Sequence, residues 1–238
     1  MKQICKLVVM LLLAFTAGVQ AQLVTYPESL NPGMPHNDDY TVRVRIPGGE
    51  WKDLFEYNVQ VDMDNVQNAS MVQFDMGSAV EVMVKKNNGS VREVTIRPLS
   101  KGIEYKQIQN AILFTLEKPQ YLSIEFDGDR LHNLHLFANP LETEKYDKET
   151  KGIMYFGPGV HRPKDLPNNQ IRIPGNTTVY LAPGAVVKAK LLVDKAENVR
   201  IIGRGILDHP IRGIEVTDSK NVLIDGITVV NPDRKSVV

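Results

Sequence analysis

Acidic residues stand in pairs at two places in the first third of the chain. Asp38 and Asp39 are adjacent, and Asp62 and Asp64 are two residues apart. Paired carboxylates can act as general acid and base or can hold a cation. Neighbouring side chains on a strand point to opposite faces, so we expect Asp38 and Asp39 in a solvated turn. Asp62 and Asp64 could share a face, but calcium takes about six to eight oxygen ligands, so a polar surface is expected there.

Histidines occur in two further clusters. His132 and His135 have the composition of a metal-binding pair, but a separation of three places them on opposite faces of a strand. Asp208 and His209 come shortly after Gly205, at a predicted corner of the chain, and could reach a surface groove. The commoner role of such an aspartate is to bond to its own backbone in a turn, and this is the role we expect.

Three other features suggest chemistry only weakly. The segment Gly203-Arg204-Gly205 lacks the third glycine and the following helix of a dinucleotide-binding fingerprint. Trp51 is the single tryptophan, and its ring could stack on a sugar, although packing over the edge of a sheet is expected. Cys5 is the single cysteine and precedes the apolar core of the N-terminal segment. We therefore expect no disulfide and no zinc-thiolate site in the mature chain.

The N-terminus predicts a cleaved secretory signal over residues 1–21. Lys2 and Lys6 precede a 13-residue apolar stretch from Leu7 to Val19, and Val19-Gln20-Ala21 has small residues at the cleavage position. That stretch is shorter than the roughly 20 residues that span a bilayer. The predicted location is therefore secreted or periplasmic, with no membrane attachment after cleavage. Without the two lysines, 26 basic and 28 acidic residues remain, a charge of −2, so nucleic acid and anionic membranes are not expected partners.

Residues 22–140 are predicted to form a β-sandwich. Apolar and polar residues alternate from Tyr40 to Ala138, which is the pattern of strands with one buried face, and turns are frequent. We expect about eight short antiparallel strands, with Asn87-Asn88-Gly89 turning the chain back through Val94 and Ile96. The predicted buried positions are Val42, Val44 and Ile46; Tyr57, Val59, Val61 and Met63; Val72, Phe74 and Met76; Val80, Val82 and Val84; Ile112, Phe114 and Leu116; and Leu122, Ile124 and Phe126.

Residues 141–152 are charged, lack apolar periodicity and are predicted to be a solvated linker. Beyond them, three segments restart at Asn176, Asn198 and Asn221, which are 22 and 23 residues apart. Each asparagine is followed by an apolar run, a glycine and a second apolar run. This repeat predicts a right-handed parallel β-helix over residues 153–238.

Stacked coils of a β-helix place equivalent side chains above one another. Two interior columns and one recurring glycine corner are predicted from the repeat. The columns are Val179, Val199 and Val222, and Leu181, Ile201 and Ile224; the corner is Gly184, Gly205 and Gly226.

The segments Tyr155–His161 and Ile171–Val187, with the coils that begin at Asn198 and Asn221, resemble the start of the β-helix in glycoside hydrolase families 28 and 49, the polygalacturonase and dextranase group. The preceding sandwich resembles the dextranase-type arrangement. The resemblance implies inverting hydrolysis of a polysaccharide such as pectin or another plant or microbial glycan, with galacturonan as the leading substrate. It implies two carboxyls roughly 6.5–9.5 Å apart.

In these families the acids lie in an Asn-Thr-Asp segment, an Asp-Asp pair on the next strand and a Gly-His-Gly loop, and the coils of this chain contain none of these. No catalytic, cofactor-binding or metal-binding residue is therefore assigned, and no cofactor is expected. We expect the catalytic coils to follow Val238, so that the 238-residue chain is an inactive N-terminal fragment that aggregates or leaves residues after Asn198 unprotected.

Two alternatives remain open. The chain could be a non-catalytic carbohydrate-binding or surface protein, which a row of exposed aromatic residues would favour, but aromatic residues are only 7% of the chain and show no such row. It could also belong to a polysaccharide lyase with the same fold, because fold alone does not separate hydrolase from lyase.

Overall fold

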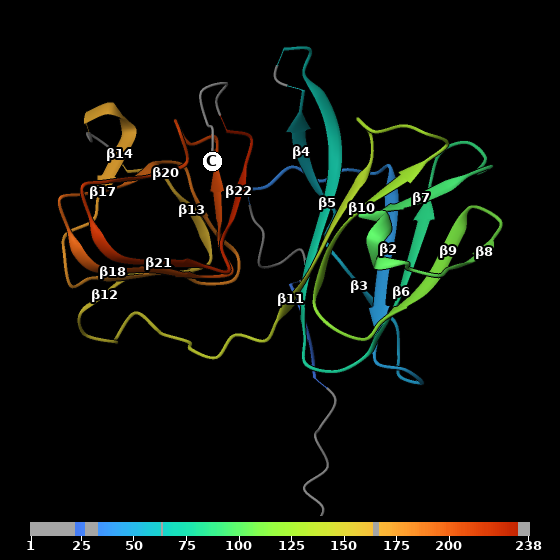
Figure 1. The fold of residues 1–238 in the computed structure, drawn as a ribbon, viewed down its shortest axis with the longest axis horizontal. Helices are drawn as coiled ribbons and strands as arrows, with labels where there is room; N and C mark the ends of the chain where they lie inside the picture. Colours follow the sequence, from blue (N-terminus) through green and yellow to red (C-terminus); the bar gives the residue numbers. More distant parts are fainter. Residues whose placement is uncertain (1–21, 27–32, 63, 164–166, 233–238) are drawn as a thin grey trace, which may run out of the picture.

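The computed structural model describes residues 22–26, 33–62, 64–163 and 167–232, and it contains two β-rich units that lie side by side (Figure 1). The prediction of an all-β protein with a sandwich followed by a parallel β-helix is confirmed. The described helices are two short 3-10 turns, η2 (Leu99–Lys101) and η3 (Pro167–Asn169). None of the described helices is long and apolar enough to cross a membrane. The predicted signal segment, residues 1–21, lies outside the described residues.

The sandwich consists of a six-stranded and a five-stranded sheet. In the first, strands run in the order β1-β5-β11-β10-β7 and β4 also pairs with β5; in the second, the order is β3-β2-β6-β9-β8. The strands of the first sheet are β1 (Leu23–Thr25), β4 (Tyr57–Val61), β5 (Gln67–Met76), β7 (Val94–Arg97), β10 (Gln120–Phe126) and β11 (Leu134–Pro140). Those of the second are β2 (Tyr40–Arg45), β3 (Lys52–Asp53), β6 (Val80–Lys86), β8 (Lys106–Ile108) and β9 (Ala111–Leu116).

Alternation along these strands buries one apolar face between the two sheets, as period-2 patterning requires. Val42 and Val44 of β2 and Phe74 of β5 are fully buried in this core. Strand β5 differs from the rest because all eight residues from Ala69 to Met76 are buried. One face of β5 lies in the sandwich core, and its other face is covered by the β-helix.

Two expectations for the sandwich are wrong in detail. Strands β5 and β11 pair in parallel, whereas all pairs were expected to be antiparallel. The segment Asn87-Asn88-Gly89 does not close a hairpin, because β6 pairs with β2 and β9 while β7 pairs with β10 in the other sheet. The segment between β6 and β7 crosses from one sheet to the other and is held there by Asp127. Its Oδ1 accepts the backbone N–H groups of Arg92 (2.8 Å) and Glu93 (3.2 Å). The bond from Arg92 and an ion pair with Lys86 lower the pKa of Asp127 to about 2.

The β-helix has three parallel sheets, two of four strands and one of three. In each sheet the strands of successive coils pair directly, which makes the winding regular. The first sheet contains β12 (Ile153–Phe156), β15 (Thr178–Leu181), β18 (Glu197–Gly203) and β21 (Lys220–Asp225). The second contains β13 (Gly159–His161), β16 (Ala185–Val187), β19 (Ile206–Asp208) and β22 (Thr228–Val230), and the third β14 (Gln170–Arg172), β17 (Lys190–Asp194) and β20 (Ile214–Thr217).

The three restart asparagines form a hydrogen-bonded ladder. The Nδ2 of Asn198 donates to Oδ1 of Asn176 (3.0 Å), and Nδ2 of Asn221 donates to Oδ1 of Asn198 (2.7 Å). All three have a φ between 52° and 58°, in the left-handed region that asparagine tolerates better than most residues. The repeated asparagine thus serves both the corner of the coil and the bond to the next coil.

The predicted interior columns are shifted by two residues in the first coil. Val179 lies opposite Ile201 and then Ile224, while Val199 lies opposite Val222. Residues that pair between the first two coils are 22 positions apart, the same spacing as Asn176 and Asn198, whereas the predicted column joined Val179 to Val199, which are 20 apart. A shift of two keeps the same face of the strand inward, so Val179, Val199 and Ile201 are still fully buried.

The predicted glycine corner is also wrong in its middle member. Pairing of Val186 with Ile206 and of Ile206 with Thr228 places Arg204, not Gly205, opposite Gly184 and Gly226. One coil therefore carries an arginine where its neighbours have glycine, and this arginine turns towards the sandwich.

The linker, residues 141–152, is docked on the β-helix rather than merely solvated (Figure 1). Glu144 forms an ion pair with both terminal nitrogens of Arg200, and these bonds lower the pKa of Glu144 to about 2. The ring of Tyr146 meets that of Tyr180 edge-on at 5.5 Å between centroids. The hydroxyl of Tyr180 donates to Glu142 (3.1 Å). The linker therefore fixes the sandwich to the first two coils as well as connecting them.

Candidate functional site

A seam between the two units contains the polar and aromatic groups that are candidates for function. Its central part is apolar and closed. Alternate residues of β4 and β5 face β16, β19 and β22 of the β-helix, and together these elements bury one cluster. Tyr57 and Val59, which were predicted to be buried, belong to this seam and not to the sandwich core. The buried members of the cluster are Met34, Phe55, Tyr57, Val59, Ala69, Met71, Val186, Ile206 and Val230.

Arg204 closes the seam at one end with a buried ion pair. Its Nε donates to both carboxylate oxygens of Asp75, at 2.9 and 3.1 Å. Its Nη1 donates to the carbonyl of Gly203 (3.0 Å) and its Nη2 to the carbonyl of Pro140 (2.6 Å). Arg204 and Asp75 are 4% and 2% exposed, so a charge left unpaired there would be costly. These bonds join β5, the end of β11 and the second coil.

Gly226 makes room for this arginine in the third coil. A Cβ on Gly226 would lie 1.9 Å from Nη1 of Arg204 and 2.5 Å from the carbonyl oxygen of Gly203. Gly226 also has a φ of 76°, which disfavours any side chain. The glycine at this corner is therefore required both by the backbone and by its neighbour.

Asp208 forms a second polar cluster at the other end of the seam. Its carboxylate contacts Nζ of Lys188 (2.6 Å), Nδ1 of His209 (2.6 Å) and Nδ2 of Asn231 (2.8 Å). The Oδ1 of Asn231 in turn accepts the backbone N–H of Gln60 in β4 (2.7 Å). The expectation that Asp208 bonds to its own backbone in a turn is wrong, because side chains of three coils converge on it.

The environment of Asp208 suits a structural carboxylate. The residue is 1% exposed, and burial alone would raise the pKa of Asp208. Hydrogen bonds from Lys188 and Asn231 and the charge of the nearby His209 outweigh burial and lower this pKa. A carboxylate that is enclosed and ion-paired in this way joins the coils to one another and, through Asn231, to Gln60 of the sandwich.

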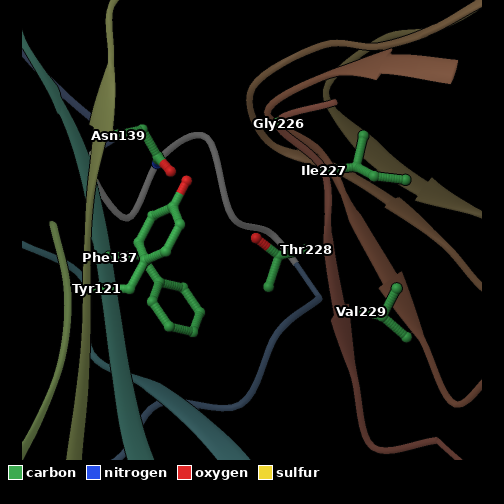
Figure 2. Close-up of a pocket in the computed structure, with 7 residues that line it drawn as sticks. All are labelled: Tyr121, Phe137, Asn139, Gly226, Ile227, Thr228 and Val229. Atoms are coloured by element: carbon green, nitrogen blue, oxygen red, sulfur yellow. The ribbon is translucent and has the colours of Figure 1, made fainter. Parts of the chain in front are cut away.

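A third part of the seam is open and aromatic (Figure 2). Tyr121 of β10, Phe137 and Asn139 of β11 form one wall of a cavity of about 290 Å³, and Gly226 to Val229 form the other. Figure 2 shows Thr228 directed towards the sandwich wall while Ile227 and Val229 point into the β-helix. The rings of Tyr121 and Phe137 meet edge-on at 5.6 Å between centroids.

This cavity continues along the sandwich into a shallower groove of about 500 Å³. Tyr121 and Phe137 line both, and Pro98, Leu99 and His135 extend the groove along β7 and β11. Tyr121 is 58% and Leu99 67% exposed, which is unusual for large apolar side chains that lie side by side. The seam thus has a closed part and an exposed apolar part.

One amide of the open part is not used by the protein itself. Asn139 is 6% exposed, and its side-chain amide has no hydrogen-bond partner among the described residues. Neither amide atom of Asn139 is among the fully enclosed atoms that lack a partner, so the amide opens to the cavity and can bond to a ligand or to water.

The acidic and histidine pairs considered from sequence do not form a site. Asp38 is exposed and contacts Nδ1 of His36, whereas Asp39 donates its backbone N–H to Asn37. Asp62 has a left-handed φ of 50° and accepts the N–H of Asn65 in a turn. In the part of the chain that the structure describes, no group of three or more His, Cys, Asp or Glu residues is placed to hold a metal ion.

His132 and His135 are separated for a reason other than strand alternation. His132 precedes β11 and contacts Asp129 (2.9 Å), whereas His135 lies within β11, where burial lowers its pKa. Trp51 lies beside the guanidinium of Arg45, which is 4.3 Å from the ring centroid. Trp51 is thus engaged at the sandwich edge, away from the open groove.

Sequence reasoning missed Arg204, Tyr121, Phe137 and Asn139. Arg204 was considered only as part of a glycine motif. Tyr121 and Phe137 occupy the non-core positions of predicted strands, where polar residues are usual, and this was a signal that could have identified them.

Comparison with known proteins supports the fold. No protein-family model matches the chain, and no curated protein sequence matches it. Among solved structures, the chain is similar to Dex49A from Penicillium minioluteum, with a TM-score of 0.59 and 21% sequence identity. The likeness covers 74% of this chain and 46% of Dex49A, so the chain spans less than half the length of the structure that it matches. At this identity the likeness establishes the fold alone.

Proposed function

We propose that these 238 residues are the N-terminal part of a secreted or periplasmic glycoside hydrolase that degrades a polysaccharide such as pectin. The observation that carries the proposal is the pairing of a sandwich with a parallel β-helix, which is similar to Dex49A over 74% of the chain. The resemblance of the coils to families 28 and 49 supports the same class. The 46% coverage of Dex49A is consistent with a role for further coils.

In this proposal, the described residues build and orient the β-helix, and the acid and base of inverting hydrolysis lie in later coils. Inversion requires one carboxyl to protonate the leaving oxygen and another to activate water from the opposite side of the ring. Asp208 is not a candidate for either role because it is enclosed and ion-paired. The charge of −2 on the mature chain fits a glycan partner better than a nucleic acid.

The test is to express the complete open reading frame that contains these residues and to measure the release of reducing ends from polygalacturonate and from dextran. We expect hydrolysis of one of them, with the inverted anomer as the first product in a proton NMR time course. The 238-residue chain alone is the matched control and is expected to release nothing above background.

Three results would contradict the proposal. Absence of cleavage by the complete protein would remove the enzyme assignment. Unsaturated products would indicate a lyase. Cleavage by the 238-residue chain alone would show that the acid and base lie in the described coils.

A further inference from the structure

The open part of the seam has the composition of a carbohydrate-binding surface. Sugar rings carry apolar C–H faces that pack on aromatic side chains and hydroxyls that need polar partners, and binding sites combine apolar walls with a few polar groups. Here Tyr121 and Phe137 supply the aromatic wall, and the Asn139 amide and the Thr228 hydroxyl supply polar atoms across the same cavity (Figure 2).

We propose that the groove lined by Tyr121, Phe137, Asn139 and Thr228 binds an uncharged hexopyranose chain, with one sugar ring stacked on Tyr121 and a sugar hydroxyl bonded to the Asn139 amide. This is a non-catalytic site between sandwich and β-helix, and it goes beyond the proposed hydrolase function because it requires no cleavage.

The amide of Asn139 is the strongest indication of a ligand. It is nine-tenths buried, lines the cavity and has no partner among the described residues, whereas Asp75, opposite it on β5, is paired with Arg204. A sugar hydroxyl can both accept from the amide nitrogen and donate to the amide oxygen.

The charges along the groove select the kind of sugar. Arg97 is the one cation among the residues that line the cavity and the groove, and its Nε already donates to Glu125 (2.7 Å). His135 is partly buried, and burial lowers its pKa, which favours its neutral form. The positive charge of Arg97 is thus compensated by Glu125, so a uronate carboxylate in the groove would have to compete with Glu125 for it, whereas an uncharged sugar would not.

The test is to express the complete open reading frame that contains these residues and to titrate the protein by calorimetry with isomaltohexaose, cellohexaose and hexagalacturonate. We expect at least one of the two uncharged sugars to bind and hexagalacturonate to bind more weakly. Tyr121→Ala should weaken binding of the uncharged sugar roughly tenfold, and Asn139→Ala roughly fivefold. Tyr121→Phe keeps the stacking ring and should stay within about twofold.

Tyr105→Ala is the matched control, because Tyr105 is an exposed tyrosine of the same sandwich outside the groove. Tyr121 is largely exposed and the Asn139 amide is unpaired, so both alanine variants should keep the urea midpoint of the parent chain. Failure of both uncharged sugars to bind would overturn the proposal, as would binding that survives Tyr121→Ala or tighter binding of hexagalacturonate. These outcomes concern binding alone, so they are separate from failure of the hydrolase assay.

Discussion

The two parts of the seam use the same kinds of residue in opposite ways. In the closed part, Arg204 and Asp75 pair with each other across the units, and Asp208 is held by Lys188 and Asn231 of the β-helix. In the open part, the ring of Tyr121 is exposed, that of Phe137 is half-buried, and the Asn139 amide has no partner among the described residues. The difference shows that a polar or aromatic residue at an interface indicates recognition of another molecule only when its own protein does not satisfy it.

Loss of the buried ion pair should produce the largest effect in the closed part. Arg204→Met leaves Asp75 as an uncompensated buried charge, and we expect the free energy of unfolding to fall by about 3–5 kcal/mol. Urea denaturation followed by Trp51 fluorescence, which reports on the sandwich, together with circular dichroism measures this loss. Arg200→Met is the control, since its pair with Glu144 is exposed and should contribute far less. A stability of Arg204→Met equal to that of the parent chain would mean that the units are held by apolar contacts alone.

Truncation of the apolar centre should have the next largest effect. Ile206 is 2% exposed and packs in the seam cluster, so Ile206→Ala should cost about 2–4 kcal/mol in the same assay. Thr228→Ala in the next coil, opposite Ile206 in register, faces the open cavity and should change stability by less than about 0.5 kcal/mol. Equal losses of unfolding free energy in Ile206→Ala and Thr228→Ala would contradict the distinction between the closed and open parts of the seam.

Acid should weaken the closed part through Asp208. Its pKa is lowered in the folded chain, so its contribution is fully present above its ordinary pKa and is lost as pH falls through the folded value. Asp208→Asn should cost about 1–2 kcal/mol at neutral pH and should flatten the fall of the urea midpoint at low pH. An unchanged acid profile in this variant would assign the pH dependence to other carboxylates.

The docked linker should show the smallest effect, and only locally. Glu144 is exposed, so Glu144→Gln should leave the urea midpoint unchanged while hydrogen exchange in residues 141–152 becomes faster. Because the pKa of Glu144 is lowered to about 2, acid should loosen the linker only as pH falls from its ordinary value towards that figure. Unaltered exchange would show that the Tyr146–Tyr180 contact suffices to hold it.

Sequence patterns that repeat locally predicted the fold well. The spacing of Asn176, Asn198 and Asn221 indicated the β-helix because each coil repeats the same corner and the same bond. Alternation indicated the sandwich strands because it reflects one buried face per strand. The pairing of β5 with β11 in parallel was not predictable in this way, since no local pattern specifies a partner strand.

The seam was not predictable because its contacts join residues far apart in sequence. Arg204 and Asp75 are 129 residues apart, and a lone charged residue is normally assigned to the surface. Tyr121 and Phe137 become neighbours only when β10 and β11 pair, and they face a cavity only once the third coil is in place.

The asparagine ladder also bears on how the gene for this protein can change. Each ladder residue repeats the same conformation and the same bond, so deletion of residues 177–198 would join Asn176 to Val199 and restore a normal corner. If only the ladder mattered, an in-frame duplication or deletion could add or remove one whole coil of the β-helix. The Arg204–Asp75 pair prevents this where the sandwich is docked, because changing the coil number there would displace the arginine from its carboxylate. The sandwich therefore fixes the coil number where it is docked.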